Sequence, residues 1–127
     1  MPNVVHKHMI MRAAVNEPLI TPTETKKWLR DLVKTIDMNI LGGPYSTYVS
    51  KEGNRGVTGI VMLETSHISI HIWDEERPAL VQADVYSCAN FSHIDVMRHF
   101  EQMKPEKIDY LLLDREATMK WSGSWPL

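Results

Sequence analysis

The sequence predicts an α+β fold, a two-layer sandwich in which a mostly antiparallel sheet carries two helices on one face. Short runs rich in β-branched residues are separated by turn signals, as in a sheet of short strands. Two other segments begin with a helix cap and continue with apolar residues at three- and four-residue spacing. One helix falls in each half of the chain, which gives the order β-α-β-β-β-β-α-β. The other sheet face then needs a polar surface or a partner.

The N-terminal half is predicted to contain one strand, one helix and a second strand. Residues 4–15 suit a strand, and Thr21, Pro22 and Glu24 have the spacing of a capping box with proline at the first helical position. The apolar face of the helix should lie on the sheet and consists of Trp28, Leu29, Leu32, Val33 and Ile36. The run 42–44 is expected to form a turn before a short strand at 45–50 and a polar loop at 51–56.

The C-terminal half is predicted to begin with an antiparallel meander of strands at 57–63, 69–73 and 81–88. Ser92 and Asp95 start a second helix that Pro105 ends, and residues 108–113 form the last strand. The tail has no periodicity, but Trp121 and Trp125 are costly to leave in water. We therefore expect the tail to dock, for example across an oligomer interface.

Composition indicates an ordinary folded protein in one domain spanning residues 1–127. Apolar residues make up 43% of the 127 and charged residues 24%. The formal charge of −2 and the lack of a block of like charges do not favour nucleic acid or an anionic membrane as partner. No apolar run is long enough to span a bilayer, so we expect a cytoplasmic protein. Cys88 is the only cysteine, which excludes an intrachain disulfide.

The residues with chemical potential gather in two neighbouring predicted strands. Residues 63–75 contain Ser66, His67 and His71, and residues 83–88 end at Cys88. If Trp73 pairs with residue 81, an antiparallel register places Cys88 opposite Ser66. Ser66 and His71 are an odd number of residues apart, so a regular strand would send them to opposite faces. A turn or bulge near Ser66 is therefore expected.

Taken without any relative, these residues allow several interpretations. Ser66 can be a structural serine at a strand start, and Cys88 can be a small buried hydrophobe. His67 and His71 can also share a sheet face with His6 and His8, which would make a metal cluster possible.

The order of these residues resembles the signature of the prokaryotic S-adenosylmethionine decarboxylase proenzymes. That signature has Glu-Ser-His, an apolar strand, His-Thr-Trp/Tyr-Pro-Glu, a short loop and Asp-Val-Phe/Tyr-Thr/Ser-Cys. The matching positions are Ser66, His67, His71, Trp73, Glu75, Asp84, Val85 and Cys88. Upstream, residues 56–61 resemble the family's Gly-Val-Ser-Gly-Val-Val, with Thr58 at the hydroxyl position. The resemblance implies the decarboxylase-like fold and a homodimer that packs two sheets face to face.

The resemblance also implies a cofactor made from the chain itself. Ser66 would attack the carbonyl of Thr65, and cleavage between these residues would leave a covalent pyruvoyl group at position 66. Thr58 would stabilise the tetrahedral intermediate and His71 would remove the serine α-proton. The pyruvoyl group would form a Schiff base with S-adenosylmethionine and accept electrons as CO₂ leaves. Cys88 would return a proton to the α-carbon, while Glu75 and Trp73 would lie near the substrate. The product is the aminopropyl donor of spermidine synthesis.

Several departures from the signature leave alternatives open. Thr65 replaces the glutamate before the processed serine, and its β-branch would crowd the carbonyl. Ile72 and Asp74 replace threonine and proline. The loop 51–55 lacks the family's aromatic residue and carries charges at Glu52 and Arg55, which suits a basic amino acid such as arginine or ornithine. A catalytically silent homologue that binds a ligand or pairs with an active subunit is a further alternative.

Overall fold

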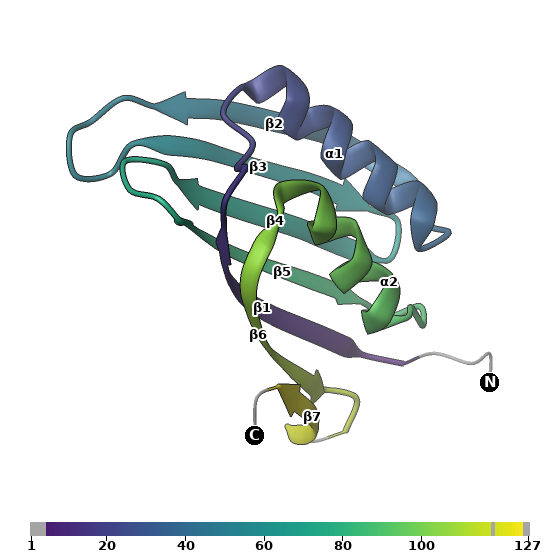
Figure 1. Ribbon diagram of the computed structural model, residues 1–127. Helices are drawn as coiled ribbons and strands as arrows, with labels where there is room; N and C mark the ends of the chain where they lie inside the picture. Colours follow the sequence, from purple (N-terminus) through teal and green to yellow (C-terminus); the bar gives the residue numbers. More distant parts are fainter. Residues whose placement is uncertain (1–4, 118, 126–127) are drawn as a thin grey trace.

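A computed structural model describes residues 5–117 and 119–125 of the protein (Figure 1). The strands are β1 (Lys7–Val15), β2 (Ile40–Val49), β3 (Gly56–Leu63), β4 (Ser66–Trp73), β5 (Ala79–Ser87), β6 (Pro105–Asp114) and β7 (Lys120–Trp125). The helices are α1 (Pro22–Thr35), α2 (His93–His99) and the short 3₁₀-helix η1 (Phe100–Met103).

The strands form one sheet in the order β2-β3-β4-β5-β1-β6-β7, and every neighbouring pair is antiparallel. Both α-helices lie over the same face of this sheet (Figure 1). The predicted fold class is thus confirmed. No helix within the described residues is long and apolar enough to cross a membrane.

The two helix starts form as the sequence predicts. The Thr21 hydroxyl accepts a hydrogen bond from the Glu24 backbone N–H at 3.2 Å, and the Glu24 carboxylate accepts one from the Thr21 N–H at 3.1 Å. Ser92 caps α2 by accepting from the Asp95 N–H at 3.4 Å. These contacts satisfy backbone donors that the first helical turn leaves free.

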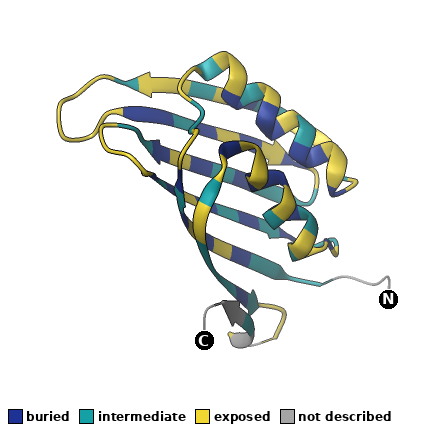
Figure 2. Cartoon of the chain, viewed as in Figure 1, coloured by how far each residue is buried: buried dark blue, intermediate teal, exposed yellow. Residues whose placement is uncertain are grey.

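The core lies between the sheet and the helices, because buried residues alternate along the central strands while α1 buries one face (Figure 2). A side-chain period of two sends alternate residues of a strand to the same sheet face. The buried set includes Met9 and Met11 of β1, Trp28 and Leu32 of α1, Ile68, Ile70 and Ile72 of β4, and Val81 and Val85 of β5.

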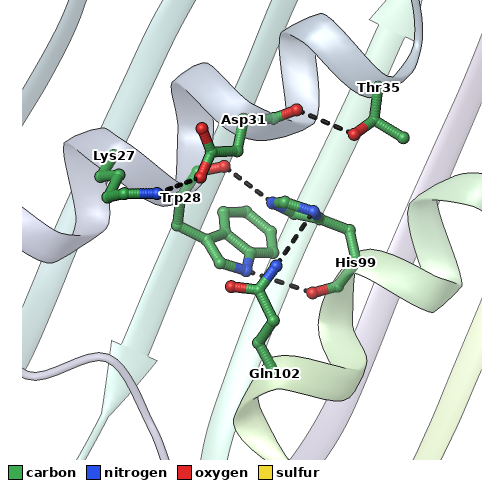
Figure 3. A network of polar contacts seen from close by, with 6 residues as sticks. All are labelled: Lys27, Trp28, Asp31, Thr35, His99 and Gln102. Carbon is green, nitrogen blue, oxygen red and sulfur yellow. Dashed lines mark hydrogen bonds and ion pairs between the residues drawn. The ribbon is translucent and has the colours of Figure 1, made fainter.

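A pair of reciprocal hydrogen bonds joins the two helices (Figure 3). The Trp28 indole N–H donates to the His99 carbonyl at 3.3 Å, and the His99 Nε2 donates to the Trp28 carbonyl at 2.8 Å. The Gln102 amide lies 3.3 Å from the other ring nitrogen and donates to it. Burial lowers the pKa of His99, so the neutral ring is favoured.

The face of the sheet opposite the helices, called here the open face, mixes apolar and polar side chains. Ile10, Ile60 and Met62 alternate with core residues and are 38%, 41% and 44% exposed. His71 and Asp84 lie among them, since both alternate with buried neighbours in β4 and β5. This face is therefore too apolar for a purely solvating surface.

The structure corrects three details of the predicted element order. Residues 42–44 do not form a turn but lie within β2, where two register shifts and a positive φ of 89° at Gly43 mark an irregularity. Strands β4, β5 and β6 begin earlier than predicted, at Ser66, Ala79 and Pro105. The tail forms β7 beside β6, and residues 126–127 of the predicted docking segment lie outside the described residues. Docking of the tail across an oligomer interface stays a prediction.

Candidate active site

Ser66 begins β4 directly after the two-residue turn that joins β3 to β4. Leu63 and Ser66 are cross-strand partners, and on the other side Ser66 faces Ser87 of β5. Ser66 has a φ of 153°, which is rare for a residue with a side chain. Strained backbone of this kind is enriched at functional sites. It also supplies the irregularity near Ser66 that its odd spacing from His71 predicts.

The carbonyl that Ser66 would attack is already bound to a donor. The backbone N–H of Cys88 donates to the Thr65 carbonyl oxygen at 3.0 Å. The predicted register is wrong by one residue, because Trp73 pairs with Leu80 and Ser87 therefore lies opposite Ser66. The predicted register would pair buried with exposed positions, whereas the observed one pairs the buried Ile72 with the buried Val81, because partners in a sheet share a face. Cys88 still lies next to the turn that precedes Ser66, because its backbone N–H contacts the Thr65 carbonyl.

Thr58 and His71 form a second group on the open face. They are cross-strand partners of β3 and β4, and the Thr58 hydroxyl lies 3.1 Å from Nδ1 of His71. Five residues of extended strand separate His71 from Ser66, a distance of about 17 Å at 3.3 Å per residue. One chain therefore does not bring the predicted processing residues together.

Trp73 and Glu75 hold the loop 51–55 in place. The Trp73 indole N–H donates to the Asn54 side chain at 2.8 Å. The two Glu75 carboxylate oxygens accept from the Gly53 and Arg55 N–H groups, both at 3.0 Å. These two backbone hydrogen bonds lower the pKa of Glu75, and the one from Arg55 has the larger effect. A hollow of about 270 Å³ lies beside both side chains.

A larger hollow lies on the open face beside His71. Its volume is about 640 Å³, and its polar lining includes Arg12, His71, Gln82, Asp84 and Asp109. Oδ1 of Asp109 is buried and accepts no hydrogen bond from the described residues, and the closest cation, the Lys107 ammonium, is 3.8 Å away. An unpaired buried acceptor is costly, so this hollow is suited to a ligand with N–H donors.

A polar network that sequence reasoning did not assign surrounds Asp84. Nε2 of His67 lies 3.2 Å and Nε2 of His8 lies 3.5 Å from Oδ1 of Asp84, and Ser69 donates to Oδ2 at 2.9 Å. Burial opposes ionisation of Asp84, but the contact with His8 and the hydrogen bond from Ser69 outweigh burial and lower its pKa. The signal was the even spacing of His67, Ser69 and His71 together with that of Asp84 and Tyr86, which places these side chains on one face.

The four histidines of the metal hypothesis do not form one cluster. His6 contacts the Tyr86 hydroxyl at 3.3 Å, His8 and His67 contact Asp84, and His71 contacts Thr58. Within the residues that the structure describes, no group of three or more histidine, cysteine or acidic side chains is arranged to hold a metal ion.

Fold and site together define a class, the two-layer α+β proteins that carry a serine at a strained β-hairpin. The sequence model of the S-adenosylmethionine decarboxylase family matches residues 8–116. The chain therefore belongs to this family, as its resemblance to the signature predicts.

Named relatives agree with this assignment. An S-adenosylmethionine decarboxylase proenzyme of Archaeoglobus fulgidus is 31% identical over 116 residues, which are 88% of this chain and 98% of the relative. A proenzyme of the same name from Methanococcus maripaludis is 33% identical over 113 residues, 86% of this chain and 88% of the relative. The crystal structure of the adenosylmethionine decarboxylase of Aquifex aeolicus superposes with a TM-score of 0.70 at 28% identity, covering 95% of this chain and 98% of that one.

Proposed function

We propose that this chain is a self-processing decarboxylase that converts Ser66 into a pyruvoyl group and acts on S-adenosylmethionine. The observation that carries the proposal is the hairpin at Ser66. There a strained serine follows a carbonyl that already accepts a hydrogen bond from the Cys88 N–H. Its relatives are named as proenzymes of this activity. The product would supply the aminopropyl donor for spermidine synthesis.

The bonds that self-cleavage makes and breaks all lie in this hairpin, apart from those of one water molecule. The Ser66 hydroxyl oxygen bonds to the Thr65 carbonyl carbon, the amide C–N bond breaks, and the hydroxyl proton ends on the released nitrogen. The developing oxyanion forms at the oxygen that the Cys88 N–H contacts, where a fixed donor is most effective. Loss of the Ser66 α-proton then breaks the ester and releases the Thr65 carboxylate. Hydrolysis of the remaining enamine gives the pyruvoyl group and ammonia.

The residues around Ser66 fit a pyruvoyl group at the start of β4. Ser66 pairs with Leu63 and Ser87, so the new terminus would stay between two strands after cleavage. When present, the group supplies an electron sink for loss of CO₂ from the substrate α-carbon. Cys88 is partly buried and next to this terminus, in a position to return a proton.

Thr58 and His71 can act on Ser66 only from a second copy of the chain. Their separation of about 17 Å along one strand is too large for proton transfer, which needs hydrogen-bond reach. A homodimer that packs the open faces together around a twofold axis can bring His71 of each copy beside the hairpin of the other, where the irregular backbone at Ser66 interrupts the alternation of the strand. Ile10, Ile60 and Met62 would be covered in this dimer.

The proposal is tested first by the intact mass of the denatured protein. Two fragments, 1–65 and a pyruvoyl-blocked 66–127, are expected, together with CO₂ release from S-adenosylmethionine. A single unmodified chain after long incubation would contradict the proposal and favour the silent binding homologue.

The twofold arrangement has its own test. Ser66→Ala and His71→Ala chains are each expected to stay intact alone. When they are co-expressed, the His71→Ala chain should be cleaved, because it retains Ser66 and meets His71 of its partner. Cleavage of His71→Ala alone would show that His71 is not needed, and no cleavage in the mixture would contradict action between copies.

A basic amino acid is the second candidate substrate. The loop 51–55 has no aromatic residue, and both Glu75 oxygens already hold that loop rather than lying free for a ribose. The hollow beside His71 contains Asp84 and the unpaired oxygen of Asp109, which suit a guanidinium or ammonium group. CO₂ release from arginine or ornithine, with none from S-adenosylmethionine, would establish this candidate.

A further inference from the structure

Ser87 is a buried hydroxyl that the proposed chemistry does not use. It is fully buried, and a buried hydroxyl needs hydrogen-bond partners to offset lost hydration. Its Oγ donates to the Thr65 Oγ1 at 3.0 Å and accepts from the Ala89 N–H at 2.9 Å. Ser87 therefore contacts the residue whose carbonyl must be attacked.

Thr65 is held at two points by consecutive residues at the end of β5. Ser87 binds the Thr65 side-chain oxygen, and the Cys88 N–H binds the Thr65 carbonyl oxygen at 3.0 Å. The Thr65 hydroxyl in turn points to the Met38 sulfur at 3.7 Å. A β-branched residue has restricted χ1, so fixing Oγ1 also restricts the backbone that carries the carbonyl.

We propose that Ser87 is a positioning residue for self-cleavage, which holds Thr65 so that its carbonyl faces the Ser66 hydroxyl. This inference rests on the proposed function, because it assigns a role within the same cleavage reaction. Two contacts to Thr65 restrict the orientation of the Thr65–Ser66 peptide plane more tightly than the Cys88 contact alone. Holding reacting groups in orientation accelerates a reaction within one chain.

The Thr65 hydroxyl thus helps to position the Thr65 carbonyl, which offsets the crowding of that carbonyl by the Thr65 β-branch. Thr65 stands where the family signature has glutamate, and its β-branch narrows the approach to the carbonyl. The Ser87 hydroxyl donates a hydrogen bond to Thr65 Oγ1, and this contact holds the Thr65 side chain in one orientation.

The test is a double-mutant cycle on ester formation in the full chain. Hydroxylamine cleaves the ester but not the amide, so the mass of fragment 1–65 as a hydroxamate counts the esters formed. Ser87→Ala and Thr65→Val should each slow ester formation about fivefold, the worth of roughly one hydrogen bond. The double variant should be no slower than the slower single variant, because both remove the same contact.

Controls separate positioning from a loss of folding. Ser87→Thr keeps the hydroxyl and should restore the rate, while Thr35→Val makes the same chemical change as Thr65→Val on the exposed side of α1 and should leave the rate unchanged. A merely structural role would slow ester formation and the later elimination alike, whereas positioning slows only the first. Multiplying effects in the double variant, or a wild-type rate in Ser87→Ala, would overturn the inference.

A second measurement keeps the inference independent of cleavage. In Ser66→Ala protein, which cannot cleave, Ser87→Ala should raise hydrogen exchange of the Cys88 amide at least about fivefold, because the Thr65 carbonyl is held less firmly. Unchanged exchange would overturn the inference. If the wild-type chain does not cleave, the proposed function fails, and this exchange measurement alone decides whether Ser87 holds Thr65.

Discussion

Replacing Gly56 by alanine should destabilise the protein far more than the same change at Gly53. A Cβ at Gly56 would lie 1.6 Å from the Ile72 carbonyl oxygen and 2.7 Å from its carbon, so β3 and β4 must separate there. Gly53 has a positive φ of 86°, but no atom lies within 4 Å of the position that a Cβ would take, so its replacement adds backbone strain alone. Gly53 lies in the loop before β3 and Gly56 begins that strand, so the two positions are only three residues apart and make a matched pair.

The expected magnitudes follow from these contacts. Backbone strain at a positive φ costs about 1–2 kcal/mol for an alanine, and this is the whole effect expected at Gly53. At Gly56 we add the loss of about two strand hydrogen bonds at roughly 1 kcal/mol each, giving about 3–4 kcal/mol in total. That is a large part of the 5–15 kcal/mol typical of a whole domain, as an order of magnitude.

Urea unfolding of Ser66→Ala protein measures both changes on a single uncut chain. The free energy of unfolding should fall by about 3–4 kcal/mol in Gly56→Ala and by about 1–2 kcal/mol in Gly53→Ala, with the same urea dependence. Equal losses of unfolding free energy in the two variants would refute the reasoning. Backbone strain alone would then explain both losses, without a clash with the Ile72 carbonyl.

Three further predictions concern pH, the Cys88 thiol and the loop 51–55. The pKa of His99 is lowered in the folded state, so below about pH 6.5 the unfolded chain binds more protons than the folded chain. The free energy of unfolding should therefore fall there as the pH decreases. His99→Gln should remove this contribution to the pH dependence, as measured by urea unfolding at several pH values. Cys88→Ala keeps the backbone N–H, so self-cleavage by intact mass should persist while the decarboxylation rate falls at least about 100-fold, and unchanged turnover would remove the thiol from the reaction. Glu75→Gln should speed amide exchange at Gly53 and Arg55, whereas unchanged exchange would show that the carboxylate does not hold the loop.

Local signals in the sequence were sufficient for much of the fold. The capping box at Thr21 and Glu24 marks a helix start because its spacing matches the backbone donors left free there. Apolar and polar residues alternate in β4 and β5, and this pattern marks the core face. The same alternation excludes the predicted register, because it would place buried residues of one strand opposite exposed residues of the other.

Other features depend on contacts that no local pattern records. The residues of β7 show no periodicity, so this strand is explained only by its pairing with β6 at the edge of the folded sheet. The two-point hold on Thr65 joins residues 22 positions apart and involves a common serine. The distance between Ser66 and His71 follows from strand geometry, but the resemblance assigns both to one reaction without saying whether they act within one copy of the chain.

The strand order decides what a cut after Thr65 would do to the molecule. Residues before the cut supply β1, β2 and β3, and residues after it supply β4 to β7. In the sheet, β1 lies between β5 and β6, so a strand of the first piece is enclosed by two strands of the second. Neither piece can leave without breaking hydrogen-bonded ladders on both sides of β1 and between β3 and β4. A nicked protein would therefore keep its size and shape in solution as two interleaved chains, and only denaturation would reveal the break.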